Sequence, residues 1–458
     1  MASARDYAHD HAEQFKQQLY ELLRIPSIST DSERKGNVRR AAEWIAAEMR
    51  RIGVNHVELL ETGGHPVVYG DWLGAEGAPT LLVYGHYDVQ PADKVNDGWS
   101  SEPFEPVERD GLIYARGSSD DKGQMFIHIK ALESVLATEG KAPVNVKFMI
   151  EGEEEIGSIH LAAFIRTNAQ RFKADVCVIS DTGMRNIDHP AITYALRGLT
   201  YMQLEVWGPE RDLHSGGYGG MVHNPALALA QIIAKLHNPD NSVAVPGFYD
   251  DVLTLTPDEK AELAKQDIAE ETIKQVTGIP ASWGEEGYTL RERLGARPTL
   301  EINGLLSGWT GEGAKTVLPA KAMAKISCRL VANQDAYKVY ELLKAYIAQI
   351  TPPTVHSELK LVGHPAPASQ VNIDTPEMQA AVRAYERGWG AAPIFSREGG
   401  SIPVVGDFKT ELGLPSILMG YGLNTDGAHG PDEHFSVAMF YRGIDTAICF
   451  LEELAKTK

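Results

Sequence analysis

Four short apolar runs, each of strand length, constrain the fold of this chain more than any other feature. They are rich in Val, Ile and Leu and comprise residues 81–84, 146–150, 176–179 and 415–419. Such runs indicate strands buried on both faces, which is typical of a parallel sheet. Segments with helical periodicity separate them, so we predict an α/β sheet covered on both sides. These helices are expected at 6–24, 38–52, 122–139, 158–170, 374–388 and 436–456.

The middle of the chain follows a different order. A length of 458 residues already predicts two or three domains. The β-α-β-β-α-β order of this segment predicts a ferredoxin-like α+β module. Its elements are expected at 192–207, 225–237, 299–303, 321–331, 335–350 and 356–362. Residues 238–298 form an insertion that the sequence does not place. The predicted division is an α/β domain with a mostly parallel sheet over 1–191 and 366–458, interrupted by the module over 192–365.

Charge and cysteine content exclude some classes of partner. The chain has 43 Lys and Arg against 62 Asp and Glu, a net charge of -19, which disfavours nucleic acid and anionic membranes. Three cysteines in apolar runs, Cys177, Cys328 and Cys449, indicate free thiols in a reducing compartment. The sequence shows neither the apolar segment of a signal peptide nor the ~20 apolar residues of a membrane span. A cytoplasmic protein is therefore expected.

Each apolar run leads into residue types that commonly bind metal ions. Asp120 and Asp121 also stand at the start of the helix predicted at 122–139. Because open α/β sheets bind ligands beyond the carboxyl ends of their strands, these side chains are expected to converge at one edge. In chain order, the groups after the four runs are His86 with Asp88, the acidic segment 151–155, Asp181 and, beyond a glycine-rich loop, His429.

Two histidines with several carboxylates suit Zn²⁺, and also Mn²⁺ or Co²⁺. Two ions need about three protein ligands each, so five residues suffice if one carboxylate is shared. Asp88 follows His86 by two residues, on the same side of an extended strand, where it would orient the imidazole ring. Each residue type also has a structural explanation, as a loop histidine, a helix cap or a turn residue. Their coincidence at all four strand ends favours a metal site.

Seven motifs, taken together, carry a resemblance to a known family. They are GHYDVQP (85–91), DGW (97–99) with Pro103-Phe104, RGSSDDKG (116–123), EGEEEIGS (151–158), DLHSG (212–216), REGGSIP (397–403) and GAHG (427–430). The set closely resembles the di-zinc metallopeptidases of the carnosinase and cytosolic non-specific dipeptidase branch, which belongs with aminoacylase, carboxypeptidase G and succinyl-diaminopimelate desuccinylase. The likeness covers essentially the whole chain. It implies a catalytic domain interrupted by a lid domain that dimerises, and hence a homodimer.

The resemblance implies five metal ligands. His86 and Asp181 would bind one ion, Glu155 and His429 the other, and Asp120 would bridge both, with zinc as the expected metal and manganese or cobalt as alternatives. The family context Gly-Ala-His favours His429 over His434 as the ligand, and Glu433 follows His429 by four residues.

Within the glutamate triplet, the family pattern makes Glu154 the general base. It would take a proton from the water that becomes a metal-bridged hydroxide and pass that proton to the leaving amine. Glu153 lies outside the pattern and is expected to be a surface charge.

Further residues would bind the substrate. His214 matches a lid histidine that reaches across a dimer to the developing oxyanion, and Arg329 a fork that grips the substrate α-carboxylate. The remaining candidates for substrate contact are Thr316, His364, Gly400 and Ser401. A carboxylate clamp would make the protein a dipeptidase that releases a C-terminal amino acid. The alternatives are an N-acyl-amino-acid deacylase or desuccinylase with the same core, and a non-catalytic binding protein on this scaffold.

Overall fold

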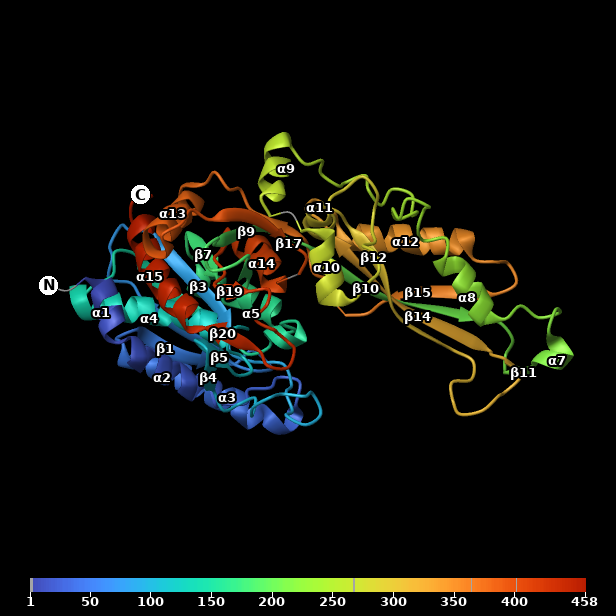
Figure 1. Ribbon diagram of the computed structural model, residues 1–458, viewed down its shortest axis with the longest axis horizontal. Coiled ribbons are helices and arrows are strands. Elements are labelled where there is room, and N and C mark those ends of the chain that lie inside the picture. Colours follow the sequence, from blue (N-terminus) through green and yellow to red (C-terminus); the bar gives the residue numbers. More distant parts are fainter. Residues whose placement is uncertain (1–2, 267, 364, 401) are drawn as a thin grey trace. The chain divides into compact units, whose positions relative to one another are not determined.

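The chain divides into two compact units in the computed structural model, which describes residues 3–266, 268–363, 365–400 and 402–458 (Figure 1). Unit 1 comprises Met1–Tyr194, Val371–Ser396 and Val404–Lys458. Unit 2 comprises Ala195–Gln370 and Arg397–Pro403. The short stretch Arg397–Pro403 therefore groups with unit 2, whereas the division predicted from the sequence places it in the α/β domain. Each unit is described by itself below.

A mixed sheet with the strand order β1-β2-β6-β3-β7-β18-β9 forms the centre of unit 1, and β17 also pairs with β9. The two-residue strand β16 pairs with Ala195 and Leu196 at the end of β9, and these four residues belong to unit 2. The four neighbouring strands β6, β3, β7 and β18 are parallel and correspond to the four apolar runs, so the predicted α/β architecture is confirmed. The bounds are β1 (Asn55–Leu60), β2 (Val67–Trp72), β3 (Thr80–His86), β6 (Asn145–Glu151), β7 (Val176–Ile179), β9 (Ala191–Leu196), β16 (Ser369–Gln370), β17 (Ile394–Glu398) and β18 (Ser416–Leu418).

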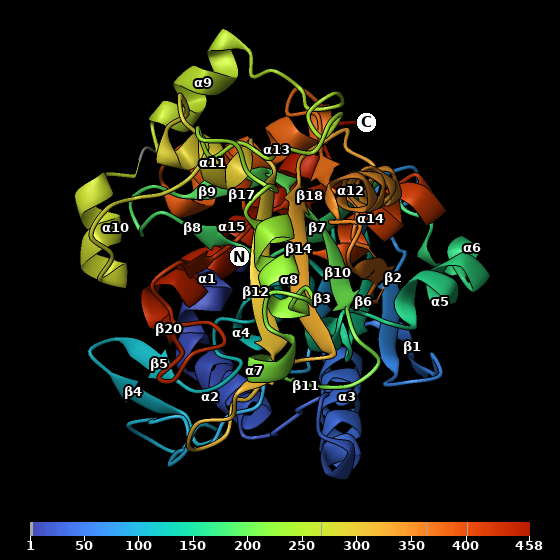
Figure 2. The same cartoon turned by 90° about the vertical axis from the view of Figure 1, so that its right-hand side faces the viewer.

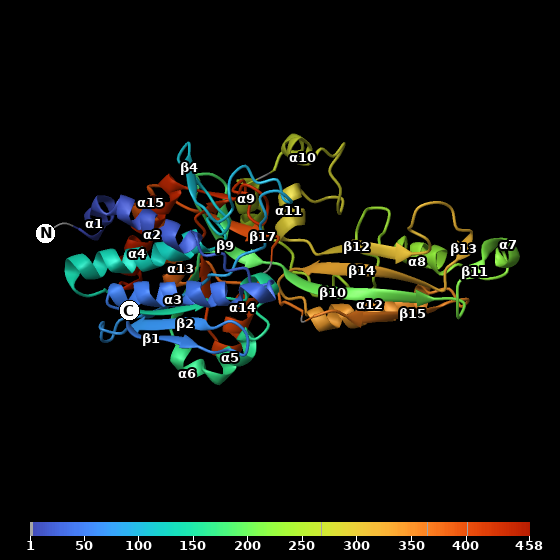
Figure 3. The same ribbon diagram turned by 90° about the horizontal axis from the view of Figure 1, so that it is seen from below.

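Helices cover both faces of this sheet (Figure 3). Because successive strand residues point to opposite faces, Val83 packs into the core that the long helices share, while the Tyr84 ring meets Phe408 on the other face. On that second face the ring of Tyr69 meets Phe172. The bounds are α1 (Ala4–Asp10), α2 (Ala12–Leu23), α3 (Lys35–Arg51), α4 (Lys122–Glu139), α5 (Leu161–Thr167), α6 (Ala169–Phe172), α13 (Pro376–Ala384), α14 (Pro403–Asp407) and α15 (Val437–Leu454).

Unit 2 contains a four-stranded antiparallel sheet in the order β12-β14-β10-β15. Helices α8 and α12 pack on one face and share its apolar core, and Figure 2 shows α8 over β14. The chain order β10-α8-β12-β14-α12-β15 is the predicted ferredoxin-like arrangement. The bounds are β10 (Gly198–Trp207), α8 (Pro225–Ile233), β12 (Thr299–Ser307), β14 (Lys321–Leu330), α12 (Ala336–Ile350) and β15 (His356–Leu361), with α9 (Pro257–Ala264), α10 (Glu270–Thr277) and α11 (Leu290–Gly295) in the insertion.

Three predicted elements are each divided in two in the structure, and one of them is the helix expected at 158–170, which is α5 and α6 with Asn168 between them. The single helix expected at 6–24 is broken at His11, whose ring stacks on Tyr7 with centroids 3.9 Å apart. The long strand expected at 192–207 is two strands, β9 and β10, which belong to different sheets. A Cβ on Gly198, the first residue of β10, would lie 2.6 Å from the carbonyl oxygen of Ala366, so the chain passes there only as glycine.

The remaining short elements complete the connections. Within the part of the chain that the structure describes, no helix is both long and apolar enough to cross a membrane. The bounds of these short elements are β4 (Val107–Arg109), β5 (Leu112–Tyr114) and β20 (His434–Ser436) in a three-stranded sheet, β8 (Gly183–Met184) with β19 (Gly422–Leu423), β11 (Leu213–His214) with β13 (Val317–Leu318), and α7 (Ser215–Tyr218).

Candidate metal centre

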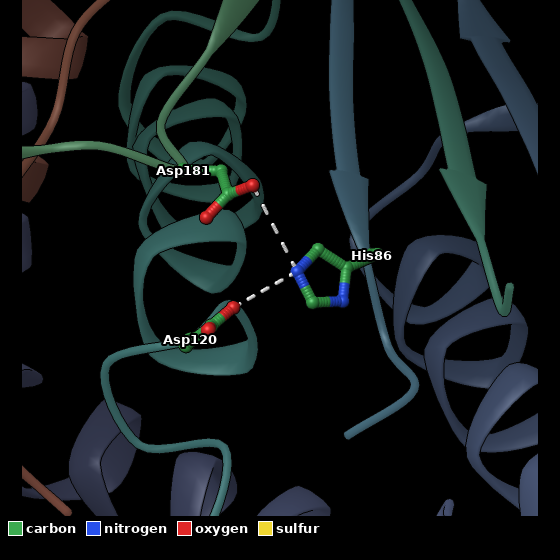
Figure 4. A group of neighbouring side chains, drawn as sticks. All are labelled: His86, Asp120 and Asp181. Atoms are coloured by element: carbon green, nitrogen blue, oxygen red, sulfur yellow. Dashed lines mark hydrogen bonds and ion pairs between the residues drawn. The ribbon is translucent and has the colours of Figure 1, made fainter. Parts of the chain in front are cut away.

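Three predicted ligands meet where two parallel strands end and a helix begins. His86 is the last residue of β3, Asp181 follows β7, and Asp120 precedes α4 (Figure 4). The Nε2 atom of His86 lies 3.1 Å from Asp120 Oδ1 and 4.0 Å from Asp181 Oδ2. The geometry is that expected for side chains at the carboxyl ends of neighbouring parallel strands.

A second group forms on the other side of the same aspartate. Asp120 Oδ2 lies 2.9 Å from His429 Nε2, which is also 3.2 Å from Glu155 Oε2. In each group the three ligand atoms lie within 4.8 Å of one another. The structure therefore brings together all five predicted ligands as two triads that share Asp120. His434 belongs to neither triad, and its Nε2 lies 3.9 Å from a different carboxylate, that of Asp426.

The charge of the two triads suits cations. Burial and the nearby Asp120 and Asp121 carboxylates raise the pKa of Asp181 well above its ordinary value. Hydrogen bonds to Asp120 and Glu155 raise the pKa of His429 to about 10. The protein thus gathers acidic groups that repel one another unless positive charge lies between them. Imidazole nitrogens with carboxylate oxygens are the donor set that Zn²⁺, Mn²⁺ and Co²⁺ accept, so the residues present fit two divalent ions.

Asp88 does more than the sequence predicts. Its side chain is fully buried, with Oδ1 3.4 Å from His86 Nδ1, which also lies 3.0 Å from the Asp88 carbonyl oxygen. The same carboxylate accepts the backbone N–H groups of Glu154, at 3.2 Å, and Glu155, at 3.1 Å. The Asp88 residue therefore holds the imidazole ring of His86 in one triad and the backbone of Glu155 in the other.

Glu154 lies beside the triads without belonging to either. It begins a short 3₁₀ turn, Glu154–Ile156, three residues after the end of β6 at Glu151. Burial raises the pKa of Glu154 well above its ordinary value, and the Asp181 and Asp120 carboxylates add to this effect although His86 opposes it. A carboxyl group in this position exchanges protons near the ligands while its own oxygens stay out of the two donor sets.

The prediction that Glu153 is a surface charge is wrong. Its side chain is only 5% exposed, and its Oε2 lies 2.8 Å from His160 Nδ1. Its Oε1 accepts the backbone N–H of His65 at 3.2 Å. A Cβ on Gly64 would lie 1.8 Å from the same oxygen, so the loop closes tightly over this carboxylate. Glu153 is a packed structural group because His160, seven residues later, and the distant loop of Gly64 and His65 enclose its carboxylate.

One polar residue near the centre was not singled out from the sequence. Gln90 donates from Nε2 to Glu155 Oε2 at 2.8 Å, and its backbone N–H donates to Oε1 at 3.2 Å. These bonds hold both oxygens of a predicted ligand. The only signal in the sequence is the position of Gln90 four residues after His86, within the first motif.

The predicted substrate residues belong to unit 2, whereas both triads consist of unit 1 residues. His214 is exposed, and its Nδ1 accepts the N–H of Gly216 at 2.9 Å. Thr316 is exposed, and its carbonyl accepts the N–H of Ser215. Arg329, next to the end of β14, is half-buried, and burial lowers its pKa. Gly400 is exposed, while His364 and Ser401 lie outside the described residues.

Comparison with known proteins gives the same family at the levels of sequence and structure. Residues 82–453 match the family described as Peptidase family M20/M25/M40. The Cys-Gly metallodipeptidase dug1 of Schizosaccharomyces pombe is 34% identical, over 97% of this chain and 96% of that protein. The Beta-Ala-His dipeptidase of Homo sapiens is 30% identical, over 95% and 85%. The solved M20 family metallo-carboxypeptidase Sso-CP2 from Sulfolobus solfataricus is 32% identical with a TM-score of 0.85, over 96% of this chain and 99% of that one.

Proposed function

The chain belongs to peptidase family M20/M25/M40 and is a metallopeptidase that hydrolyses dipeptides, and from this premise we propose that two divalent ions, Zn²⁺ first among them, occupy the two triads. One observation carries the proposal. The two oxygens of Asp120 face two different histidines, and each histidine has a second carboxylate of its own. A single aspartate in this position would be a ligand of both ions.

The residues around the triads then have separate tasks. Bound divalent ions would supply a water of lowered pKa and polarise the scissile carbonyl. Glu154, outside both donor sets, accepts the proton of the attacking water and delivers it to the leaving amine. Asp88 keeps the His86 ring and the Glu154–Glu155 backbone in place during these transfers.

We assign the C-terminal end of the substrate to unit 2. The Arg329 guanidinium is the fork that pairs with the substrate α-carboxylate, because a planar guanidinium matches a carboxylate in two parallel hydrogen bonds. The remaining contacts to this end of the substrate are assigned to Thr316, His364, Gly400 and Ser401. Hydrolysis would release a C-terminal amino acid, in agreement with the dipeptidase and metallo-carboxypeptidase names of the similar proteins.

A homodimer through unit 2 is part of the proposal. Strand β12 lies at the edge of its sheet, and large apolar side chains are exposed on and near it. Exposed apolar groups beside an unpaired strand edge favour association with a second copy. In such a dimer His214 would stabilise the oxyanion. The exposed apolar side chains on β12 and just beyond its end are Leu305, Leu306 and Trp309, and Tyr218, Met221 and Leu227 are exposed elsewhere in unit 2. A cytoplasmic location is supported by three buried free cysteines.

One substrate panel tests the proposed specificity. Dipeptides, N-acetyl amino acids and N-succinyl amino acids are offered to zinc-loaded protein, each with a free and an amidated carboxyl terminus. We expect turnover of free dipeptides, with amidation lowering kcat/KM by about 100-fold or more because Arg329 loses a charged partner. Preference for N-acyl amino acids would replace the dipeptidase with a deacylase. Equal turnover of amidated dipeptides would remove the carboxylate clamp.

A further inference from the structure

A buried ion pair, Arg116 with Glu433, is bonded to the segments that carry one of the two triads. Their side chains are 3% and 0% exposed, and Arg116 Nη1 donates to Glu433 Oε2 at 2.8 Å. Burying two charges is costly unless their remaining hydrogen-bonding capacity is used. The other hydrogen-bond partners of Arg116 and Glu433 therefore show which segments this ion pair holds in place.

Glu433 holds the loop of the bridging aspartate. Its Oε2 also accepts the N–H of Gly117 at 3.0 Å, and its Oε1 accepts those of Ser119 and Asp120, each at 3.0 Å. Four donors thus converge on one carboxylate. The residue that fixes the backbone of Asp120 stands four positions after His429, so Glu433 ties two ligands of the same triad together.

Arg116 bonds to the backbone beside His429 and to the backbone beside Gln90. Its Nη2 donates to the carbonyl oxygens of Gly430, at 3.2 Å, and Pro91, at 3.4 Å. Gly430 follows His429 directly, and Pro91 follows Gln90, which donates two hydrogen bonds to Glu155. One guanidinium and its carboxylate partner therefore hold the backbone at Asp120 and next to His429, and they reach Glu155 indirectly, through Pro91 and its neighbour Gln90. Only the fork of an arginine spans partners in these directions.

The other triad has different supports. The backbone N–H of His86 donates to Asp121 Oδ2 at 3.1 Å, and its ring is held by Asp88. Asp181 follows Ser180, whose Oγ lies 2.6 Å from His128 Nε2. Among the described residues, neither Arg116 nor Glu433 forms a hydrogen bond with the side chains that support His86 and Asp181. Asp120 is the one ligand that both sets of supports share.

From this asymmetry we propose that Arg116 and Glu433 are positioning residues chiefly for the metal position formed by Asp120, Glu155 and His429, and that the position formed by His86, Asp120 and Asp181 depends on them only through the loop of the shared Asp120. The inference rests on the two-metal centre proposed above. It predicts that a change at the buried pair separates the two affinities.

The test uses full-length protein freed of metal, with zinc affinities measured by competition against a chromophoric chelator. Glu433→Gln keeps the shape of the side chain and removes its charge, and Arg116→Lys keeps the charge and removes the fork. We expect one of the two zinc affinities to fall about 10- to 100-fold in each variant. The other affinity should change much less. The melting temperature of each metal-free variant is measured alongside.

Background variants assign the weakened position. In Asp181→Asn, where the Asp120, Glu155 and His429 group is left intact, adding Glu433→Gln should weaken the intact zinc site. In His429→Asn, where the His86 group is left intact, the same addition should have little effect. Equal losses in the two backgrounds, or no loss in either, would overturn the proposal. Arg116→Lys carries the same comparison if the Glu433 variant does not fold.

A matched control comes from another buried network in unit 1. Glu48 on α3 is buried and pairs with Arg51 on the same helix and with Lys130 on α4. Glu48→Gln should lower the melting temperature of the metal-free protein and leave both zinc affinities unchanged. A loss of zinc affinity in this control would reduce the effect at Glu433 to general destabilisation. If the unaltered protein binds fewer than two zinc ions, the two-metal centre itself fails, a result separate from any difference between the variants.

Discussion

Asp120 and Glu154 illustrate two different uses of a carboxylate in one centre. Asp120 turns each of its oxygens to a different histidine, whereas Glu154 stays outside both triads. Binding and proton transfer are therefore assigned to separate side chains. A substitution that spares the first function and removes the second can tell them apart.

Glu154→Gln is expected to keep its bound zinc and to lose about 10²- to 10⁴-fold in kcat, because the amide neither accepts nor delivers the proton. Stopped-flow or steady-state kinetics with a free dipeptide, together with metal analysis, measure both quantities. Glu153→Gln is the matched control, since Glu153 is next to Glu154 in the sequence and its carboxylate bonds to His160 and to the His65 backbone. It should lower stability and leave kcat within a few-fold. Undiminished turnover in Glu154→Gln would remove this residue from proton transfer.

At this scale the sequence reveals ligand types but not their supports. Residues such as His86 and Asp181 stand out because each follows an apolar run. Glu433 meets Gly117 across 316 positions of sequence, and no local pattern indicates such a contact. The error at Glu153 has the same origin in part, because the loop of Gly64 and His65 that covers its carboxylate comes from 88 positions earlier in the chain.

Among the elements, the four parallel strands were predictable because burial on both faces leaves a continuous apolar run. The marginal strands β1 and β2 pair antiparallel and have mixed composition, so they carry no comparable signal. The break between β9 and β10 depends on how closely Gly198 approaches Ala366, a tertiary contact. The insertion at 238–298 lacks a strong pattern, yet its helices have a definite position.

Helices α9 and α11 of this insertion brace the segment Arg397–Pro403. Arg397 forms an ion pair with Glu259 on α9. Glu398 accepts from Arg291 on α11 at 3.0 Å. These contacts place the insertion around the segment that carries two of the residues proposed to bind the substrate carboxylate.

Loosening this brace should weaken substrate binding more than chemistry. Arg291→Met removes the α11 contact, and we expect KM for a free dipeptide to rise several-fold with a smaller change in kcat. Glu285→Gln is the control, since Glu285 pairs with Arg297 elsewhere in unit 2, at 2.6 Å. It should leave KM unchanged. Identical KM values in both variants would mean that the brace has no part in substrate binding.

For the whole molecule, metal removal should abolish turnover and lower stability together. The acidic groups of the two triads lose the cations that would offset their repulsion, and ligand binding to the folded state stabilises it by RT ln(1 + [L]/Kd). Chelation should reduce dipeptide hydrolysis to background and lower the melting temperature. Added Zn²⁺, Mn²⁺ or Co²⁺ should restore both. Full turnover by protein verified to be metal-free would contradict the proposed chemistry.

Association through unit 2 is testable in the same way. Leu305→Lys with Leu306→Lys places charge on the exposed edge strand β12 and should shift the protein to monomer in analytical ultracentrifugation. Activity should fall while zinc content is retained, because His214 would no longer reach a second copy. Leu73→Lys, at an exposed site of unit 1, should leave the dimer intact. A dimer that persists in the double variant would place the interface elsewhere.

The stretch Arg397–Pro403 has a consequence for engineering. Unit 1 segments flank it on both sides in sequence, although it packs with unit 2. A contiguous fragment cut at the two ends of Ala195–Gln370 would lack Gly400 and leave Glu259 and Arg291 without their partners. Chimeras that exchange unit 2 between relatives must therefore transplant two separate pieces of sequence, since a module moved in one piece would lack the stretch to which we assign two of the substrate contacts.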